Sequence, residues 1–394
     1  MAIYYRWCVI LLFVNLNIFA QTEYYDLKKA LKKADKVNHL ILNGQGLTSL
    51  PAKIGAFVVL EELHLNENNL TDLPKEITEL IYLELIDLSN NPNLDLTKVF
   101  VKLAQLPNLT TVILSSNNLI KLPEEIGLMQ CLLKLDLRNN KLASLPPGIK
   151  GLKSLKNLDL RFNRLQYLPP EFGKLVALEE LVLRNNLLSK LPVEIGQLKN
   201  LKKLILSNSP TLNFADAFIK LAPIRGLTNL DLKYNQLLEL PATIGLLESL
   251  KGLNLSYNGI SKIPEEFANL KNLEVLYMGF NTLGEIPETI TSLLKLKQLS
   301  LWNTGVKTIP ASIKKLSNLE VLLINQNEIT VLPLEFENLI KLETLNLSNN
   351  KINVLPGKMK SLIGLKELIL TNNNFSDAEK ERIKLELSAV DIDF

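Results

Sequence analysis

Three arginines recur at a fixed spacing of 23 residues, at Arg138, Arg161 and Arg184. Two of them follow an aspartate by two residues, since Asp136 and Asp159 precede the first two arginines. If neighbouring strands carry these residues, the guanidinium groups form a row, because adjacent strands lie about 5 Å apart. Planar guanidiniums bind carboxylates and phosphates through paired hydrogen bonds, so the row can form a slot for an acidic or phosphorylated segment. The alternative is a surface of Arg–Asp pairs that satisfy one another, each of which contributes little.

Aromatic side chains follow at the same spacing. Tyr234, Tyr257 and Phe280 are again 23 residues apart, and Tyr277 and Trp302 lie close to them in the sequence. Protein interfaces enrich Tyr, Trp and Arg, because these side chains bury a large area at a small cost in entropy. At least one of Phe162 and Phe280 is expected to fill the core at a turn. The predicted partner-binding residues are Arg138, Arg161, Arg184, Lys233, Asp136, Asp159, Tyr257, Tyr277 and Trp302.

The sequence contains no motif for catalysis or for metal binding. The two histidines, His39 and His64, stand without a paired cysteine or carboxylate motif, and no glycine-rich phosphate loop is present. We therefore expect no catalytic residue, no metal site and no cofactor, and the chain is not predicted to be an enzyme. The formal net charge of +3 argues against nucleic acid as the main partner.

A repeated unit must position these side chains. In one copy, Leu158-Asp159-Leu160 forms a short strand, Asn163 bonds the exposed backbone of the following turn, and Pro169 fixes an extended return path. The residue that corresponds to Asn163 occurs fifteen times, at Gln45, Asn68, Asn91, Asn117, Asn140, Asn163, Asn186, Ser209, Asn235, Asn258, Asn281, Thr304, Asn327, Asn350 and Asn373. We call these fifteen residues the ladder positions. The ladder is expected to be locally weak at Gln45, Ser209 and Thr304, which are not asparagine.

The repeat predicts which side chains are free for function. The strand leucines face inward, so the residues six, four and two positions before each ladder position face outward. A single unit cannot bury its leucines alone, which means that the copies must stack into a solenoid. Two copies are longer, at 26 residues, and the apolar period after Asn91 and after Ser209 predicts a short helix in each. We interpret these helices as a local change in curvature on the outer side rather than as docking elements.

The chain has different segments at its two ends. Residues 1–20 resemble a secretory signal peptide, with a retained membrane anchor as the alternative, and no membrane span is predicted after cleavage. Residues 21–38 are predicted to be an amino-terminal helical cap, and residues 39–375 hold the repeats. Residues 376–394 are predicted to be a helix-strand cap, because Ser376-Asp377-Ala378-Glu379 is a capping box.

The repeated pattern Leu-x-x-Leu-x-Leu-x-x-Asn-x-Leu-x-x-Leu-Pro-x-x-Ile-x-x-Leu resembles the leucine-rich repeat. The form with 23 residues and Leu-Pro is similar to that of Ras-group-related and Scribble-like proteins and of many bacterial secreted or surface proteins. The resemblance implies an α/β solenoid, a horseshoe with a parallel β-sheet on its concave face and a mostly irregular convex side.

The resemblance also implies a function, which is protein recognition without a common ligand. We therefore expect an exported, monomeric scaffold, secreted, periplasmic or at the cell surface, that binds a protein partner through the concave face. The alternative is a structural protein of the cell envelope that self-associates or binds glycan through its convex face.

Overall fold

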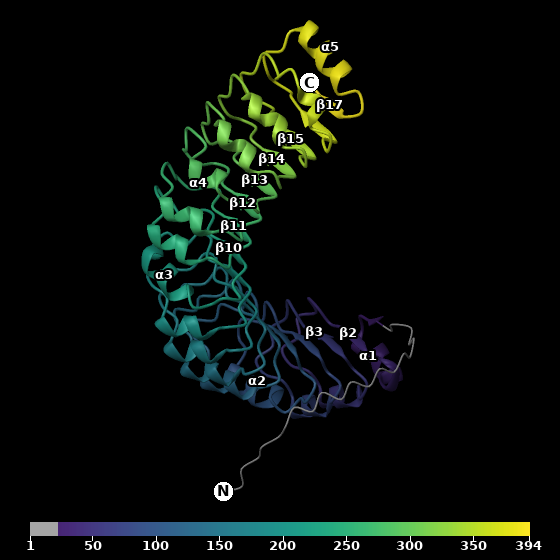
Figure 1. Ribbon diagram of the computed structural model, residues 1–394. Helices are drawn as coiled ribbons and strands as arrows, with labels where there is room; N and C mark the ends of the chain where they lie inside the picture. The colour runs from purple at the N-terminus through teal and green to yellow at the C-terminus, as the bar shows by residue number, and fades with distance from the viewer. Residues whose placement is uncertain (1–22) are drawn as a thin grey trace. The chain divides into compact units, whose positions relative to one another are not determined.

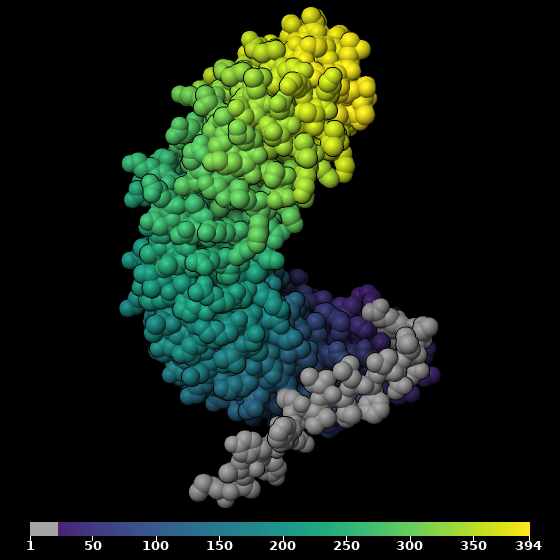
Figure 2. Space-filling view, in the orientation of Figure 1, coloured from purple at the N-terminus to yellow at the C-terminus, as the bar shows by residue number. Residues whose placement is uncertain are grey.

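The computed structural model describes residues 23–394, and the predicted signal peptide lies outside this range. The chain divides into two compact units. The first holds the described residues up to Leu187 together with Pro192–Leu201, and the second holds Leu188–Leu191 and Lys202–Phe394. Within each unit the strands line one side, which we call the strand face, and the short helices lie on the opposite side (Figure 1). On the side shown in Figure 2, the side chains of successive turns in the second unit pack closely against one another.

Each repeat contributes one short strand to a parallel sheet. Neighbouring strands keep the repeat register, so that Leu135 lies opposite Leu158. The first unit contains β1 (Glu23–Tyr24), β2 (His39–Ile41), β3 (Glu62–His64), β4 (Leu85–Asp87), β5 (Thr111–Ile113), β6 (Lys134–Asp136), β7 (Asn157–Asp159) and β8 (Glu180–Val182). The second contains β9 (Lys203–Ile205), β10 (Asn229–Asp231), β11 (Gly252–Asn254), β12 (Val275–Tyr277), β13 (Gln298–Ser300), β14 (Val321–Leu323), β15 (Thr344–Asn346), β16 (Glu367–Ile369) and β17 (Asp391–Asp393). The predicted repeat solenoid with a parallel sheet is confirmed.

The side opposite the sheet is built from short helices. The α-helices are α1 (Leu27–Ala30), α2 (Leu96–Leu103), α3 (Phe214–Leu221), α4 (Glu288–Thr291) and α5 (Asp377–Glu386). The 3₁₀-helices are η1 (Leu31–Lys36), η2 (Ala52–Ala56), η3 (Lys75–Glu79), η4 (Glu124–Leu128), η5 (Pro147–Gly151), η6 (Pro170–Lys174), η7 (Val193–Gln197), η8 (Ala242–Leu246), η9 (Glu265–Asn269), η10 (Ala311–Lys315), η11 (Leu334–Asn338) and η12 (Met359–Ser361). The two helices predicted in the longer repeats are α2 and α3, and both predictions are confirmed.

The proline of the Leu-Pro step starts most of these 3₁₀-helices. In η6, Pro169 is the cap with φ −69° and ψ 155°, and its carbonyl oxygen accepts a hydrogen bond of 2.9 Å from the N–H of Phe172. The pyrrolidine ring already holds φ near −65°, and the missing N–H is not needed at the start of a helix. Phe172 is thereby turned into the core, where it is fully buried.

The ladder asparagines join neighbouring turns. The Asn163 side-chain amide donates to the carbonyl oxygens of Leu137 at 2.9 Å and Leu160 at 3.0 Å. Its Oδ1 accepts from the N–H of Leu142 at 3.0 Å. The side chain therefore satisfies three backbone groups that would otherwise be buried without a partner. Because two of these groups belong to the preceding repeat, each asparagine holds two turns together.

The three ladder positions without asparagine differ from one another. Gln45 donates from Nε2 to the carbonyl oxygen of Tyr25 at 2.9 Å. The Thr304 hydroxyl donates to the carbonyl oxygen of Leu301 at 2.7 Å. The Ser209 hydroxyl is buried and has no hydrogen-bond partner within residues 23–394. The predicted local weakness of the ladder is therefore clearest at Ser209, whose hydroxyl is too short to replace an amide.

The amino-terminal cap is not helical throughout. Residues 23 and 24 form β1, which pairs in parallel with β2 and so covers the edge of the sheet with backbone hydrogen bonds. The helices α1 and η1 follow only after Asp26, whose carboxylate accepts from the N–H of Lys29 at 2.9 Å. At the other end, Ser376 caps α5 by accepting from the N–H of Glu379 at 3.2 Å. Within residues 23–394, no helix combines the length and the apolar character needed to cross a bilayer.

Candidate functional site on the strand face

The aspartates of the strand face first serve the backbone. Asp136 Oδ1 accepts from the N–H of Arg138 at 3.0 Å, and Asp159 Oδ1 accepts from the N–H of Arg161 at the same distance. These N–H groups lie just past the ends of β6 and β7, where the chain leaves the sheet. A carboxylate two residues earlier is a short-range acceptor for such a group. Each aspartate therefore shapes the turn that presents its arginine.

The same aspartates also pair with the arginine side chains. Arg138 Nε lies 3.2 Å from Asp136 Oδ2, and Arg161 Nη2 lies 2.8 Å from Asp159 Oδ2. In the second unit, Lys233 Nζ lies 3.7 Å from Asp231 Oδ2. The sequence left open whether the arginines form a slot for an acidic segment or pair with the aspartates. Arg138 and Arg161 pair with the aspartates. Partly exposed pairs of this kind contribute little to stability.

Arg184 has a different environment. The residue two positions before it is Val182, which is nearly buried. Valine therefore stands where the other two repeats have the aspartate that pairs with the arginine. The Arg184 guanidinium carbon lies 5.7 Å from the centre of the Phe162 ring. Phe162 is 44% exposed, so the expectation that it fills the core is wrong. Within the described part of the chain, Arg184 Nε is buried and has no hydrogen-bond partner, as is also true of Arg161 Nε.

Burial changes the acidity of one of these aspartates. The Asp136 side chain is almost buried, and this burial raises the pKa of its carboxyl above the ordinary value near 3.8. The N–H and the guanidinium of Arg138 act in the opposite direction and lower the pKa, but their effect is smaller. Asp136 is therefore a carboxylate held in the sheet rather than one that is open to solvent.

Four aromatic rings form a continuous cluster in the second unit. Tyr234 and Tyr257 stack with their ring centres 4.4 Å apart, and Tyr257 and Phe280 stack at the same separation. Trp302 meets Phe280 at 4.3 Å with an angle of 76° between the ring planes. We call Tyr234, Tyr257, Phe280 and Trp302 the aromatic stack. Phe280 is half-buried in this stack rather than a core residue, so the expectation of a core filler is wrong for Phe280 as well.

A left-handed backbone turn places three of these rings. Tyr234, Tyr257 and Phe280 have φ angles of 61°, 57° and 55°. All fifteen residues that precede a ladder position have positive φ, and glycine or asparagine occupies many of these sites. Bulky side chains rarely adopt this conformation, which costs an L-residue about 1–2 kcal/mol. The aromatic residues of these three successive repeats therefore occupy sites where glycine or asparagine would be less strained.

Gly279 makes room for Trp302, and sequence reasoning did not identify it. Gly279 stands two residues before a ladder position, 23 residues before Trp302. A Cβ atom on Gly279 would lie 2.0 Å from Trp302 Nε1 and 2.1 Å from Cδ1. The indole therefore occupies the space of the missing side chain. The signal in the sequence is a glycine one repeat before an outward tryptophan.

The two tyrosines among the predicted residues belong to the same unit as the aromatic stack. Tyr277 is 37% exposed, and its hydroxyl donates to Gln298 Oε1 at 3.0 Å. Burial raises the pKa of the Tyr257 hydroxyl above 10.0, and the neighbouring Tyr234 adds to the effect. The predicted residues thus form two sets. The arginines and aspartates belong to the first unit, and Lys233, Tyr257, Tyr277 and Trp302 belong to the second.

The histidines have a carboxylate partner that sequence reasoning missed. Glu62 Oε2 lies 3.3 Å from His39 Nδ1 and 3.1 Å from His64 Nε2. His39 and Glu62 are opposite one another in register, which only the pairing of β2 with β3 reveals. Among residues 23–394, no three His, Cys, Asp or Glu side chains are placed to hold a metal ion.

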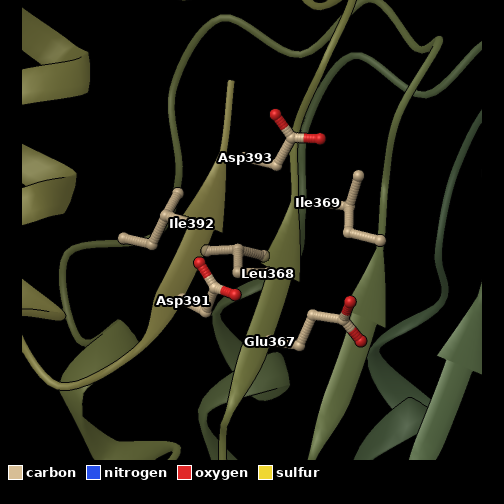
Figure 3. A pocket seen from close by; sticks show the side chains of 6 residues that line it. All are labelled: Glu367, Leu368, Ile369, Asp391, Ile392 and Asp393. Carbon is tan, nitrogen blue, oxygen red and sulfur yellow. The ribbon is translucent and has the colours of Figure 1, made fainter.

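A pocket of about 390 Å³ lies between β16 and β17 (Figure 3). Its lining residues are Glu367, Leu368, Ile369, Asp391, Ile392 and Asp393. Three of them are acidic, and charged residues on terminal strands discourage pairing with other chains. None of the predicted site residues lines this pocket.

Comparisons with known families give a consistent result. A family model described as leucine rich repeat matches residues 107–165, 153–210 and 225–283. A second model, described as leucine-rich repeat region, matches residues 285–390. A comparison with curated proteins finds no match.

Solved structures extend the similarity over nearly the whole chain. A leucine-rich repeat protein of Leptospira interrogans is 37% identical with a TM-score of 0.80, over 95% of this chain and 100% of that one. A chain of the Toll–Spatzle complex of Drosophila is 26% identical with a TM-score of 0.72, over 89% of this chain and 49% of that one. The ectodomain of the Arabidopsis thaliana receptor kinase GASSHO1/SCHENGEN3, in complex with CASPARIAN STRIP INTEGRITY FACTOR 2, is 27% identical with a TM-score of 0.55. That match covers 92% of this chain and 47% of the other.

Proposed function

Because the chain belongs to the leucine-rich repeat family, whose members generally serve as protein-interaction scaffolds, we propose that it is an exported, non-catalytic protein that binds a partner protein through its strand face. The similar Drosophila and Arabidopsis thaliana proteins were solved in complexes, which supports a recognition role.

The environment of Arg184 is the observation that carries this proposal. Its guanidinium lies over the half-exposed Phe162 ring and has no carboxylate partner in its own repeat. An arginine next to an exposed aromatic ring is a common centre of binding energy in protein interfaces. A carboxylate of the partner would form charge-assisted hydrogen bonds with this guanidinium. Arg138 and Arg161, already paired with Asp136 and Asp159, would contribute to orientation more than to affinity.

The other predicted residues form the second part of the proposed surface. Tyr257, Tyr277 and Trp302 offer partly exposed aromatic area, and Lys233 belongs to the repeat that precedes that of Tyr257. Export is supported by residues 1–20, whose sequence resembles a signal peptide. Intact-mass measurement of the protein secreted by its source cells tests export directly, because cleavage after Ala20 removes a calculable mass.

A capture experiment tests the recognition surface. Proteins retained by the immobilised wild-type chain are quantified by mass spectrometry and compared with those retained by Arg184→Ala. The variant is expected to retain at least about tenfold less of a specific partner, because truncating a central hot-spot arginine costs about 2 kcal/mol and tenfold corresponds to about 1.4 kcal/mol. Arg164→Ala is the matched control, since Arg164 is an exposed arginine just after a ladder position and outside the strands. If Arg184→Ala folds normally and retains the same proteins, the proposed surface is wrong.

A further inference from the structure

The strand face of the second unit carries a broad region without charge. Across β11 to β15, the residues six, four, two and one positions before each ladder position include no Asp, Glu, Lys, Arg or His. Charged residues do stand one position before several of these strands, and some of them pair with one another. Glu274, for example, lies 3.0 Å from Lys297 and 3.6 Å from Lys251. The strand face of the first unit, by contrast, carries Arg138, Arg161 and their aspartates.

The uncharged region combines the aromatic stack with side-chain amides that have hydrogen-bonding groups unpaired within the described part of the chain. Asn303, Asn325 and Gln326 follow Trp302 on the same face, and their side chains make no hydrogen bond with residues 23–394. Gln298 uses its oxygen to accept from Tyr277, which leaves its Nε2 donors available. An amide both donates and accepts, as a sugar hydroxyl does, so the two groups are complementary.

From this juxtaposition we propose that the strand face of the second unit binds an uncharged oligosaccharide, with Trp302 as its central contact. A sugar ring presents C–H groups on its faces and hydroxyls around its rim. The C–H groups pack on aromatic rings and the hydroxyls bond the amides. About one quarter of the residues of a typical protein are charged, and the charges of a protein ligand would be desolvated here without partners. An uncharged sugar chain avoids this cost.

The choice of residues at the site supports a role in binding. Every repeat has positive φ at the position before its ladder residue, and in three successive repeats an aromatic residue takes this position. The turn does not need an aromatic side chain, since asparagine occupies the same position at Asn303 and Asn349. In addition, Gly279 leaves its side-chain space to Trp302. Strained residues that surround one surface point to function rather than to folding. The inference rests on the proposed function only in treating this face as a recognition surface.

Trp302 provides its own signal for the test. The chain has two tryptophans, Trp7 and Trp302, so Trp302 is the only tryptophan in the full chain with Trp7→Phe. A glycan array with neutral, sialylated and sulfated chains identifies the strongest neutral ligand. Titration with that ligand is then followed by the fluorescence of Trp302 and by calorimetry. We expect neutral chains to be selected and the Trp302 emission to shift on binding.

Two variants examine the contact itself. Trp302→Ala is expected to weaken calorimetric binding at least about tenfold, which corresponds to about 1.4 kcal/mol, because loss of a central aromatic anchor costs at least that much. Gly279→Ala keeps the tryptophan but displaces the indole, and a similar loss is expected. Tyr82→Ala is the matched control, since Tyr82 is an exposed aromatic residue outside the strands. Circular dichroism and urea denaturation verify that each variant is folded.

Several results would overturn the proposal. They are selection of charged over neutral chains, no binding of any neutral chain, and equal affinity of the folded Trp302→Ala and wild-type proteins. A partner protein captured by the wild-type chain can also be deglycosylated and tested again. If it still binds equally well and its binding requires Trp302, the face binds uncharged peptide instead. Loss of glycan binding with intact Arg184-dependent capture would remove this inference and leave the proposed function standing.

Discussion

Replacement of Asn163 by alanine should destabilise the first unit by about 3 kcal/mol. The side chain is only 7% exposed, and it makes hydrogen bonds of 2.9, 3.0 and 3.0 Å with Leu137, Leu160 and Leu142. A hydrogen bond contributes about 1 kcal/mol net, and a buried group left without a partner costs about 1–3 kcal/mol. Three bonds therefore give about 3 kcal/mol as a lower estimate.

Asn157→Ala in the same repeat is the matched control. Asn157 lies on the strand face, and its amide makes one long hydrogen bond of 3.4 Å to Glu180. Substitutions of this kind usually change stability by less than about 0.5 kcal/mol. Both variants replace an asparagine by alanine, so the difference between their free energies of unfolding reports the environment of Asn163.

Urea denaturation and hydrogen exchange measure the effect. The free energy of unfolding should fall only in Asn163→Ala, and the Leu142 amide should lose its protection most. Protection of amides in the second unit should change little, because stability in repeat arrays comes from contacts between neighbours. Equal denaturation midpoints for the two variants would refute the reasoning and would mean that water or local relaxation replaces the ladder bonds.

Three further predictions concern charge and backbone. Burial raises the pKa of Asp136, so the folded protein binds this proton more tightly than the unfolded chain does. The resulting stabilisation is complete below the ordinary pKa of aspartate and is lost as the pH rises. As the pH is lowered from neutral to about 4, the wild type should therefore gain stability relative to Asp136→Asn. The hydrogen bond from Arg382 lowers the pKa of Glu379, so Glu379→Gln should lose about 1 kcal/mol at neutral pH, and this difference should disappear as acid protonates the wild type. Tyr257→Asn should change stability by less than about 1 kcal/mol, because relief of positive φ offsets two lost ring contacts, while oligosaccharide binding should weaken.

Each of these predictions has a clear contrary result. An Asp136 carboxyl that titrates by NMR below its ordinary range would contradict the first. A stability difference for Glu379→Gln that persists in acid would contradict the second. A large loss of stability in Tyr257→Asn, measured by urea denaturation, would mean that the aromatic stack supports folding rather than recognition.

The sequence alone determined the architecture and the orientation of most side chains. The spacing of the ladder positions predicted a solenoid with a parallel sheet, because a strand with alternating leucines has only one face to bury. The same alternation placed Arg161 and Trp302 on the outer side of the strands. The helices α2 and α3 could also be predicted, since their apolar period differs from that of the other repeats.

Tertiary structure decided what each outward residue contacts. Arg138 and Arg161 pair with aspartates, whereas Arg184 lies over Phe162, although all three occupy the same repeat position. The Trp302 indole occupies the space left by Gly279, a residue one full repeat away. Such contacts depend on side-chain rotamers and on the lateral register between turns, and neither is encoded within one repeat. The periodic sequence therefore specifies the scaffold, and the packing between its copies specifies the site.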